Sequence, residues 1–297
     1  MERITKDAFC VIGKVGSTND GPDFVKKLWE DANGHFDEVA PFAVKKENGA
    51  LAGIWGAMTS FQFDFQPWED NFTKGLYLAG VEARTDAIPP KGWKKWIIPG
   101  YDYLKVEVTE KDTFATTIAY MKEQNIPLAG AVHDFTDPET GKNYMMFPVV
   151  MNDSKNKLIQ EEKKKVSPFA ACGLHCDYCF LTEWCGGCRS TCNMCSYATI
   201  YEDNLCPNLS CSKEKGLDGC YECEQIADCK KGFYNPQSDG AIASKAYAIF
   251  QKKYGKEAFV TALKKLHGTY DFNKLHELFN DNVEKTVQIL EENCEQV

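Results

Sequence analysis

Cysteine is distributed very unevenly along this chain. Of its 14 cysteines, twelve lie between Cys172 and Cys229, and only Cys10 and Cys294 lie outside this segment. Four pairs have the spacing C-x2-C: Cys176/Cys179, Cys185/Cys188, Cys192/Cys195 and Cys220/Cys223. Two sulfurs at this spacing can bind one metal ion from a tight turn. Because this segment is too short to build a large apolar core, we expect bound metal to supply much of its folding free energy.

The expected metal ligands are the cysteines of this segment: Cys172, Cys176, Cys179, Cys185, Cys188, Cys192, Cys195, Cys206, Cys211, Cys220, Cys223 and Cys229. Zinc, as about two or three ions, is the first choice because all-cysteine zinc sites use C-x2-C pairs. Iron–sulfur clusters are an alternative, favoured by the opening C-x3-C-x2-C and by Cys206-Pro207. Disulfides are a third alternative. The spacing does not decide which cysteines combine.

Charge and hydropathy exclude several classes of protein. The net charge of −9 argues against a general nucleic-acid binder, which needs clustered Lys and Arg. The opening MERITKDAFCVIGKVG lacks the long apolar run of a secretory signal, and no segment approaches about 18 apolar residues. We therefore expect a cytoplasmic protein without a membrane span, in which thiols stay reduced and disulfides are disfavoured.

The composition changes along the chain and predicts four parts. They are a first domain over 1–151, a polar linker over 152–168, a Cys-rich module over 169–235 and a helical tail over 236–297. In the tail, apolar residues recur at helical spacing, and Gly255 and Gly268 are expected to end the first two helices.

Strand and helix patterns alternate in the first domain. Strands are expected over 9–16, 51–59, 76–84, 101–108, 128–136 and 144–151, and helices over 23–36 and 111–125. This order is β-α-β-β repeated twice. Such repeats usually pair into one sheet with both helices on one face, so the expected fold class is α+β.

Several short motifs carry a resemblance to a known family. GIWGAM, YLAGVEA, IPPKGW, IIPGYDYLKVEV, GAVHDF and YMMFPVV, in this order, resemble the GyrI-like small-molecule-binding domain, which also occurs in AraC-type and multidrug-sensing regulators. The resemblance covers roughly residues 1–151. It implies two fused β-α-β-β units with a ligand cleft for hydrophobic, often cationic molecules. Some family members hydrolyse cyclopropane drugs.

Glu82 is the main candidate residue in this cleft. Strand alternation puts Leu78, Gly80 and Glu82 on one face of their strand. Pattern alone would favour an exposed carboxylate, but the resemblance implies an acidic residue at the base of the pocket. Such a carboxylate would attract a cation, and surrounding rings would add about 0.5–2 kcal/mol each.

The expected pocket wall is aromatic. We assign Trp55, Glu82 and Tyr103 to it, together with Trp68 and Phe147. Most aromatic strand residues are simply core residues, so this assignment depends on the resemblance. The chain shows no helix-turn-helix, so a stand-alone sensor, ligand sink or enzyme is expected rather than a fused transcription regulator.

Hydrolysis is an alternative function. It would use Glu82 and, at the GAVHDF motif, Asp134 in place of the glutamate that hydrolytic members carry. His133 alternates to the face opposite Asp134, so both cannot line one pocket. The discriminating observation would be hydrolysis of an electrophilic cyclopropane that is lost in Glu82→Gln.

Two further alternatives stay open. One is an iron–sulfur redox protein, and the other is an interaction protein whose pocket is filled by its own side chains. The Cys-rich segment also resembles a small domain family of unknown function with the pattern CGLxCxxC…CxGC…CxxC. It could present a surface to a protein partner.

Overall fold

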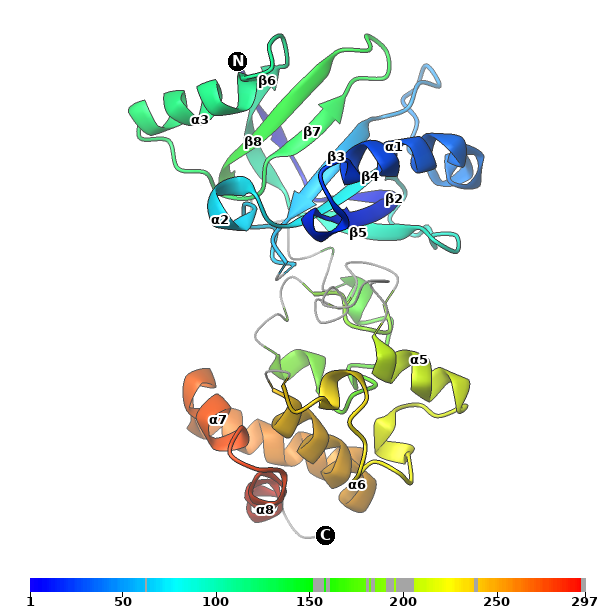
Figure 1. Ribbon diagram of the computed structural model, residues 1–297, viewed down its shortest axis with the longest axis vertical. Coiled ribbons are helices and arrows are strands. Elements are labelled where there is room, and N and C mark those ends of the chain that lie inside the picture. The colour runs from blue at the N-terminus through cyan, green and yellow to red at the C-terminus, as the bar shows by residue number, and fades with distance from the viewer. Residues whose placement is uncertain are drawn as a thin grey trace. The chain divides into compact units, whose positions relative to one another are not determined.

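A computed structural model gives the structure of the chain (Figure 1). It describes residues 1–61, 63–151, 158, 161–179, 182, 185–190, 195, 206–237 and 240–294. The chain divides into two compact units, the first mainly Met1–Lys165 and the second mainly Val166–Thr182 and Tyr197–Val297. Each unit is described by itself below.

The first unit is built on one antiparallel sheet of eight strands. The strands are β1 (Glu2–Lys6), β2 (Phe9–Ser17), β3 (Ile54–Thr59), β4 (Leu76–Ala83), β5 (Lys94–Ile98), β6 (Tyr101–Glu107), β7 (His133–Thr136) and β8 (Asn143–Met151). The helices are α1 (Phe24–Gly34), α2 (Glu69–Phe72) and α3 (Thr113–Glu123). Each predicted strand and helix is present, in the predicted order.

The sheet has the order β1-β6-β8-β7-β3-β4-β2-β5, with all pairs antiparallel. The two β-α-β-β repeats form its two halves and meet at the β7–β3 pair. Each half is extended by a strand that the sequence patterns did not predict. β1 joins the first strand of the second repeat, and β5 joins the first strand of the first repeat.

The short links to these edge strands force the sheet to curl. β1 and β2 are six strand spacings apart in the sheet, which would be roughly 29 Å if it were flat. Only Asp7 and Ala8 connect them, and three residue steps span at most about 11 Å. Pro99 and Gly100 impose the same limit between β5 and β6. The two edges therefore approach each other across one face of the sheet.

The two faces of the sheet bury different cores. On the helix face, Tyr77, Ala79 and Val81 of β4 pack against α1, and a separate cluster packs against α3. The opposite face, which we call the inner face, carries Trp55 and Leu78 in a largely aromatic core. This alternation agrees with the predicted one for β4, and both helices lie on one face as expected.

The segment after β8 contributes to the first unit. Leu158 packs against Cys10 and Ile97. Glu162 forms an ion pair with the Lys95 ammonium at 3.7 Å, and Lys95 is almost fully buried. The residues predicted as a linker therefore include some that contact the sheet. The predicted linker bounds themselves stay a prediction, because residues 152–157, 159 and 160 are not described.

The second unit combines short cysteine-bearing turns with helices. The helices are α5 (Pro207–Glu214), α6 (Ala241–Thr269), α7 (Phe272–Phe279) and α8 (Val283–Asn293). One core joins α6, α7 and α8, and another joins α6 to the cysteine-bearing segments. Gly255 has φ 85°, so it interrupts α6 as predicted, because this backbone conformation suits glycine. Gly268 does not end a helix, since α6 continues to Thr269.

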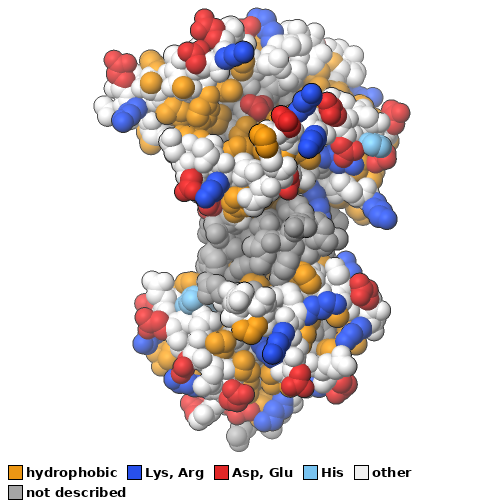
Figure 2. All heavy atoms as spheres, in the orientation of Figure 1, with side chains coloured by type: hydrophobic (Ala, Val, Ile, Leu, Met, Phe, Trp, Pro, Cys, Tyr) orange, Lys and Arg blue, Asp and Glu red, His pale blue; other side chains and the backbone are white. Residues whose placement is uncertain are grey.

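The surface is mixed. Figure 2 shows Lys, Arg, Asp and Glu side chains over both units, with hydrophobic side chains gathered beside α3. None of the helices in the described ranges is long and apolar enough to cross a membrane.

Candidate ligand site and candidate metal centre

Glu82 lies on the inner face and is held by two partners. Its carboxylate accepts a hydrogen bond from the indole Nε1 of Trp55 at 3.1 Å and from the Lys6 ammonium at 3.0 Å. The Glu82 side chain is 12% exposed and that of Lys6 is 27% exposed. The carboxylate is thus fixed and mostly shielded, while its cationic partner reaches it from the more accessible side.

Aromatic rings surround this ion pair. The ring centroids of Phe9 and Trp55, and of Trp55 and Phe135, are each 4.6 Å apart. The Lys6 ammonium lies 4.3 Å from the Phe9 centroid and 5.6 Å from the Trp55 centroid. Both distances are within the range of cation–π attraction. The site is therefore a carboxylate and an aromatic row with a cation in place between them.

Gly53 makes room for this arrangement. A Cβ at this position would lie 2.6 Å from Trp55 Nε1, 2.7 Å from a ring carbon of Phe135 and 3.4 Å from a Glu82 oxygen. The first two distances are shorter than real Cβ contacts allow. The two rings can therefore meet beside Glu82 only because residue 53 has no side chain.

The other predicted wall residues lie in two places. Tyr103 is buried on the inner face, against Tyr101. Trp68 and Phe147 lie on the helix face, where Trp68 donates to the Leu76 carbonyl at 3.0 Å and Phe147 packs in the core beneath α3. The structure therefore brings Trp55, Tyr103 and Glu82 to one face and places the remaining two on the other.

Asp134 is also on the helix face. Its carboxylate accepts from the Tyr77 hydroxyl at 2.9 Å, and that hydroxyl accepts from the Trp29 indole at 3.1 Å. Burial raises the pKa of Asp134. The sheet separates this carboxylate from Glu82, so the structure does not bring the two candidate hydrolytic groups together.

Four buried polar atoms on the inner face have no hydrogen-bond partner. They are Trp96 Nε1, Tyr101 Oη, Tyr103 Oη and His133 Nε2. The other ring nitrogen of His133, Nδ1, accepts from the Met58 N–H at 3.0 Å. The proton of the neutral ring is therefore on Nε2, which makes it a donor. Each unpaired buried group costs about 1–3 kcal/mol.

His133 should make the stability of the first unit depend on pH. Burial lowers its pKa to about 3, whereas an unfolded chain has a value of about 6.5. Between these values the unfolded state binds a proton that the folded state does not, so stability falls as pH falls. We expect the free energy of unfolding to fall between pH 7 and pH 5 by about 1–2 kcal/mol more in the wild type than in His133→Gln. Urea unfolding at the two pH values, followed by tryptophan fluorescence, would measure it.

A matched comparison uses His35, an exposed histidine of the same unit. The variant His35→Gln should retain the wild-type pH dependence. Equal pH dependence of the wild type and His133→Gln would mean that His133 is not buried as a neutral group.

Residues outside the sequence-based assignment complete the site. Lys6 was missed because β1, ERITK, is short, polar and largely exposed, so no hydrophobic pattern marks it. Phe9 was placed in a strand but not in the pocket, since its contact with Trp55 depends on β2 and β3 lying on either side of β4. Phe135 was missed because the sequence-based assignment placed its neighbour Asp134 in the pocket, whereas Phe135 lies on the other face of the strand, with His133.

In the second unit, two thiols lie beside Asn208, and a third lies near both of them and near a fourth. Its side-chain amide donates to the Cys220 sulfur at 3.7 Å, and its oxygen lies 4.0 Å from the Cys206 sulfur. Burial raises the pKa of the Cys172 thiol, and neighbouring thiols raise it further. Those neighbours are Cys206, Cys188 and Cys220. These four cysteines come from four separate segments of the chain.

Two of the C-x2-C pairs share a local conformation. Cys176 and Cys220 each begin a single 3-10 turn. In each pair the N–H of the second cysteine, Cys179 or Cys223, donates to the carbonyl of the first, at 3.3 and 3.0 Å. Such turns direct both side chains of a pair to one side, which suits a metal knuckle.

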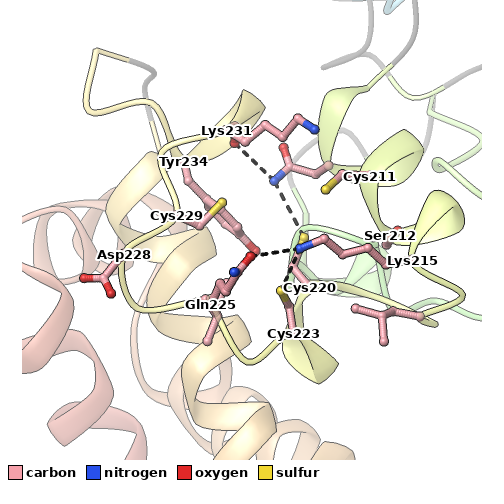
Figure 3. Close-up of a pocket in the computed structure, with 13 residues that line it drawn as sticks. Cys211, Ser212, Lys215, Cys220, Cys223, Gln225, Asp228, Cys229, Lys231 and Tyr234 are labelled. Atoms are coloured by element: carbon pink, nitrogen blue, oxygen red, sulfur yellow. Dashed lines mark hydrogen bonds between the residues drawn. The ribbon is translucent and has the colours of Figure 1, made fainter.

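A cavity of about 370 Å³ lies beside Cys220 (Figure 3). Cys211, Cys220, Cys223 and Cys229 contribute to its wall. The Lys215 ammonium donates to the Cys223 sulfur at 3.6 Å and to the Gln225 oxygen at 3.1 Å. The wall thus combines four thiols with cationic and amide groups.

The donor chemistry of this unit fits zinc or iron, since thiols are the ligands of both. Within the described ranges, however, no group of three or more His, Cys, Asp or Glu side chains is arranged to hold a metal ion. Cys192, one of the predicted ligands, lies outside the described residues.

Comparison with known proteins gives limited similarity. No family model and no curated protein matches the chain. Several solved structures match, and two of them are each similar over 50% of the chain. One is SAV2435 bound to tetraphenylphosphonium, with 11% identity over 92% of that chain and a TM-score of 0.35. The other is the integron cassette protein VCH_CASS2 from the mobile metagenome of Vibrio cholerae, with 16% identity over 94% of that chain and a TM-score of 0.30. These values are too low to transfer a ligand to this chain.

Proposed function

We propose that the first unit binds a hydrophobic organic cation at Glu82, between the rings of Phe9 and Trp55. One observation carries this proposal: the chain's own Lys6 ammonium lies in that position, paired with the carboxylate and close to both rings. The site therefore has the chemistry of a cation site, and its occupant belongs to a flexible side chain.

An organic cation could compete with Lys6 for two physical reasons. A primary ammonium is strongly hydrated, so the partly exposed Lys6 loses little when it returns to water. A large apolar cation is poorly hydrated and would bury much more apolar surface against the rings. Glu82 stays in place during the exchange because Trp55 Nε1 also holds it.

Replacing Lys6 by methionine tests the proposal. We expect Lys6→Met to bind tetraphenylphosphonium about tenfold more tightly than the wild type, because removing the internal cation ends both the competition and the charge repulsion. Isothermal titration calorimetry would measure the affinity. The free variant should also be less stable, since Glu82 loses its partner, and the added cation should restore part of this loss.

The control is Lys14→Met. Lys14 also lies over an indole ring, 4.6 Å from the Trp93 centroid, but on β2 toward the helix face. Its loss should leave the affinity for tetraphenylphosphonium unchanged. Unchanged or weaker binding in Lys6→Met would contradict competition at Glu82.

We also propose that the second unit is held together by zinc bound to cysteine thiolates. What supports this is the proximity of the Cys172 thiol to those of Cys188, Cys206 and Cys220, together with the two matching C-x2-C turns. Zinc would supply folding free energy there, and the cation site would lie in the other unit. Iron with sulfide would instead favour the redox alternative.

A further inference from the structure

The four unpaired atoms of the inner face form an unusual set. Trp96, Tyr101, Tyr103 and His133 are all almost completely buried, with exposed fractions of 0%. Buried polar groups nearly always have partners. Trp96 Nε1 and His133 Nε2 can only donate here, and both hydroxyls can donate as well. What is missing at this place is therefore a hydrogen-bond acceptor.

These donors adjoin the site at Glu82. Val11 of β2 is the cross-strand partner of Glu82 on one side and of Trp96 on the other. Lys6 of β1, which pairs with Glu82, is the cross-strand partner of Tyr101. Cross-strand partners share a face. The donors and the ion pair therefore belong to one continuous inner face.

Two phenylalanines pack against one of these donors, Trp96. Phe63 and Phe65 are completely buried, and their ring centroids lie 5.0 and 6.2 Å from that of Trp96. A Cβ at Gly130 would lie 2.7 Å from the Tyr101 hydroxyl and 3.1 Å from the Phe65 carbonyl, which already accepts from the Ala131 N–H at 2.7 Å. Both phenylalanines have positive φ, 60° and 57°, which is costly for residues other than glycine. Hydrocarbon rings cannot accept ordinary hydrogen bonds, so the donors stay unpaired.

We propose that these donors bind an acceptor oxygen of the ligand, and that Phe63 and Phe65 occupy its place until a ligand enters. This inference rests on the proposed cation site. It specifies the ligand as a hydrophobic cation that also carries a carbonyl or ether oxygen. The cationic end pairs with Glu82, and the oxygen reaches the donors after the phenylalanines move aside.

A matched pair of probes tests the inference. Hexyltriphenylphosphonium and (5-oxohexyl)triphenylphosphonium share charge and length, but only the second has an acceptor oxygen. We expect the ketone to bind about tenfold more tightly in calorimetry, the effect of one or two ordinary hydrogen bonds. The preference should disappear in the double variant Tyr101→Phe/Tyr103→Phe. It should persist in Tyr120→Phe, a change on the solvent side of α3.

The outcomes separate the two proposals. If both probes bind equally to the wild type, the cation site stands and the acceptor site is wrong. If neither probe binds, the cation site itself is wrong, and the acceptor inference falls with it. A preference that survives in the double variant would also overturn the assignment of the donors.

Thermal unfolding without ligand gives a second measurement. Removing an unpaired hydroxyl should leave the melting temperature unchanged or raise it by about 2–4 °C in Tyr101→Phe and in Tyr103→Phe. A fall of the same size in both would show that these hydroxyls already have partners, which would overturn the inference. For the phenylalanines, Phe63→Ala should bind both probes more tightly, and weaker binding would show that the ring supports the site instead of filling it.

Discussion

Replacing Glu82 by glutamine is expected to weaken the binding of tetraphenylphosphonium by about 30- to 150-fold. The change removes the only carboxylate that contacts Trp55 Nε1 and the Lys6 ammonium among the described residues. Loss of one partner from a shielded charge pair costs about 2–3 kcal/mol, which corresponds to this range. Lys6 would stay near the rings and would then repel the ligand. Titration calorimetry at low salt measures the effect.

Glu38 provides a control with a similar hydrogen-bond partner. Its carboxylate accepts from the indole of Trp93 at 2.7 Å, and the Lys14 ammonium lies over that ring. Glu38→Gln therefore removes a carboxylate that also pairs with an indole, but one that is exposed and lies on the helix side of the sheet. We expect it to change the affinity less than twofold. Equal losses of affinity in the two variants would point to a general effect of charge. Unchanged affinity in Glu82→Gln would contradict the proposed cation site.

Removal of zinc is expected to unfold the second unit. Structural zinc contributes about 10–16 kcal/mol of apparent binding free energy in small modules, which exceeds the stability of an ordinary domain. The full chain, purified without oxygen and without a metal-binding tag, should contain about two or three zinc ions. Cys206→Ser should lower this number by about one, and the unit should lose its cooperative unfolding.

Cys294→Ser is the matched control, because this thiol lies at the end of α8, away from the cysteine-rich segment in sequence. It should leave both zinc content and unfolding unchanged. If the protein instead contains iron and acid-labile sulfide and is brown, the proposal of zinc is wrong and an iron–sulfur cluster is present. If the protein contains neither zinc nor iron, the disulfide alternative becomes the favoured one.

The filled inner face raises the alternative of a protein that binds no small molecule. Phe63 and Phe65 close the space at Trp96, as such a protein would require. Four unpaired donors argue for a ligand instead, because each costs stability and a purely structural core would gain from apolar residues in their place. The probe pair described above distinguishes these interpretations directly.

Local sequence patterns determined most elements of this protein. The β-α-β-β order, the two helices on one face and the alternation along β4 follow from hydrophobic periodicity, which depends only on neighbouring residues. Cysteine spacing likewise indicated metal-binding turns without any knowledge of the fold. Glu82 and Trp55 could be named from the motifs that carry them.

Only the tertiary structure decided what lies around Glu82. Lys6 reaches it because a two-residue link draws edge strand β1 to β2, and such closure leaves no periodic signal in the sequence. Phe9 lies on β2, which pairs with the strand of Glu82, a pairing between segments that are distant in the chain. Trp68 and Phe147 were assigned to the pocket through the family resemblance, but strand direction and loop path put them on the helix face. Burial without partners, as at Trp96 and His133, is likewise a property of packing, which depends on residues that are distant in the chain.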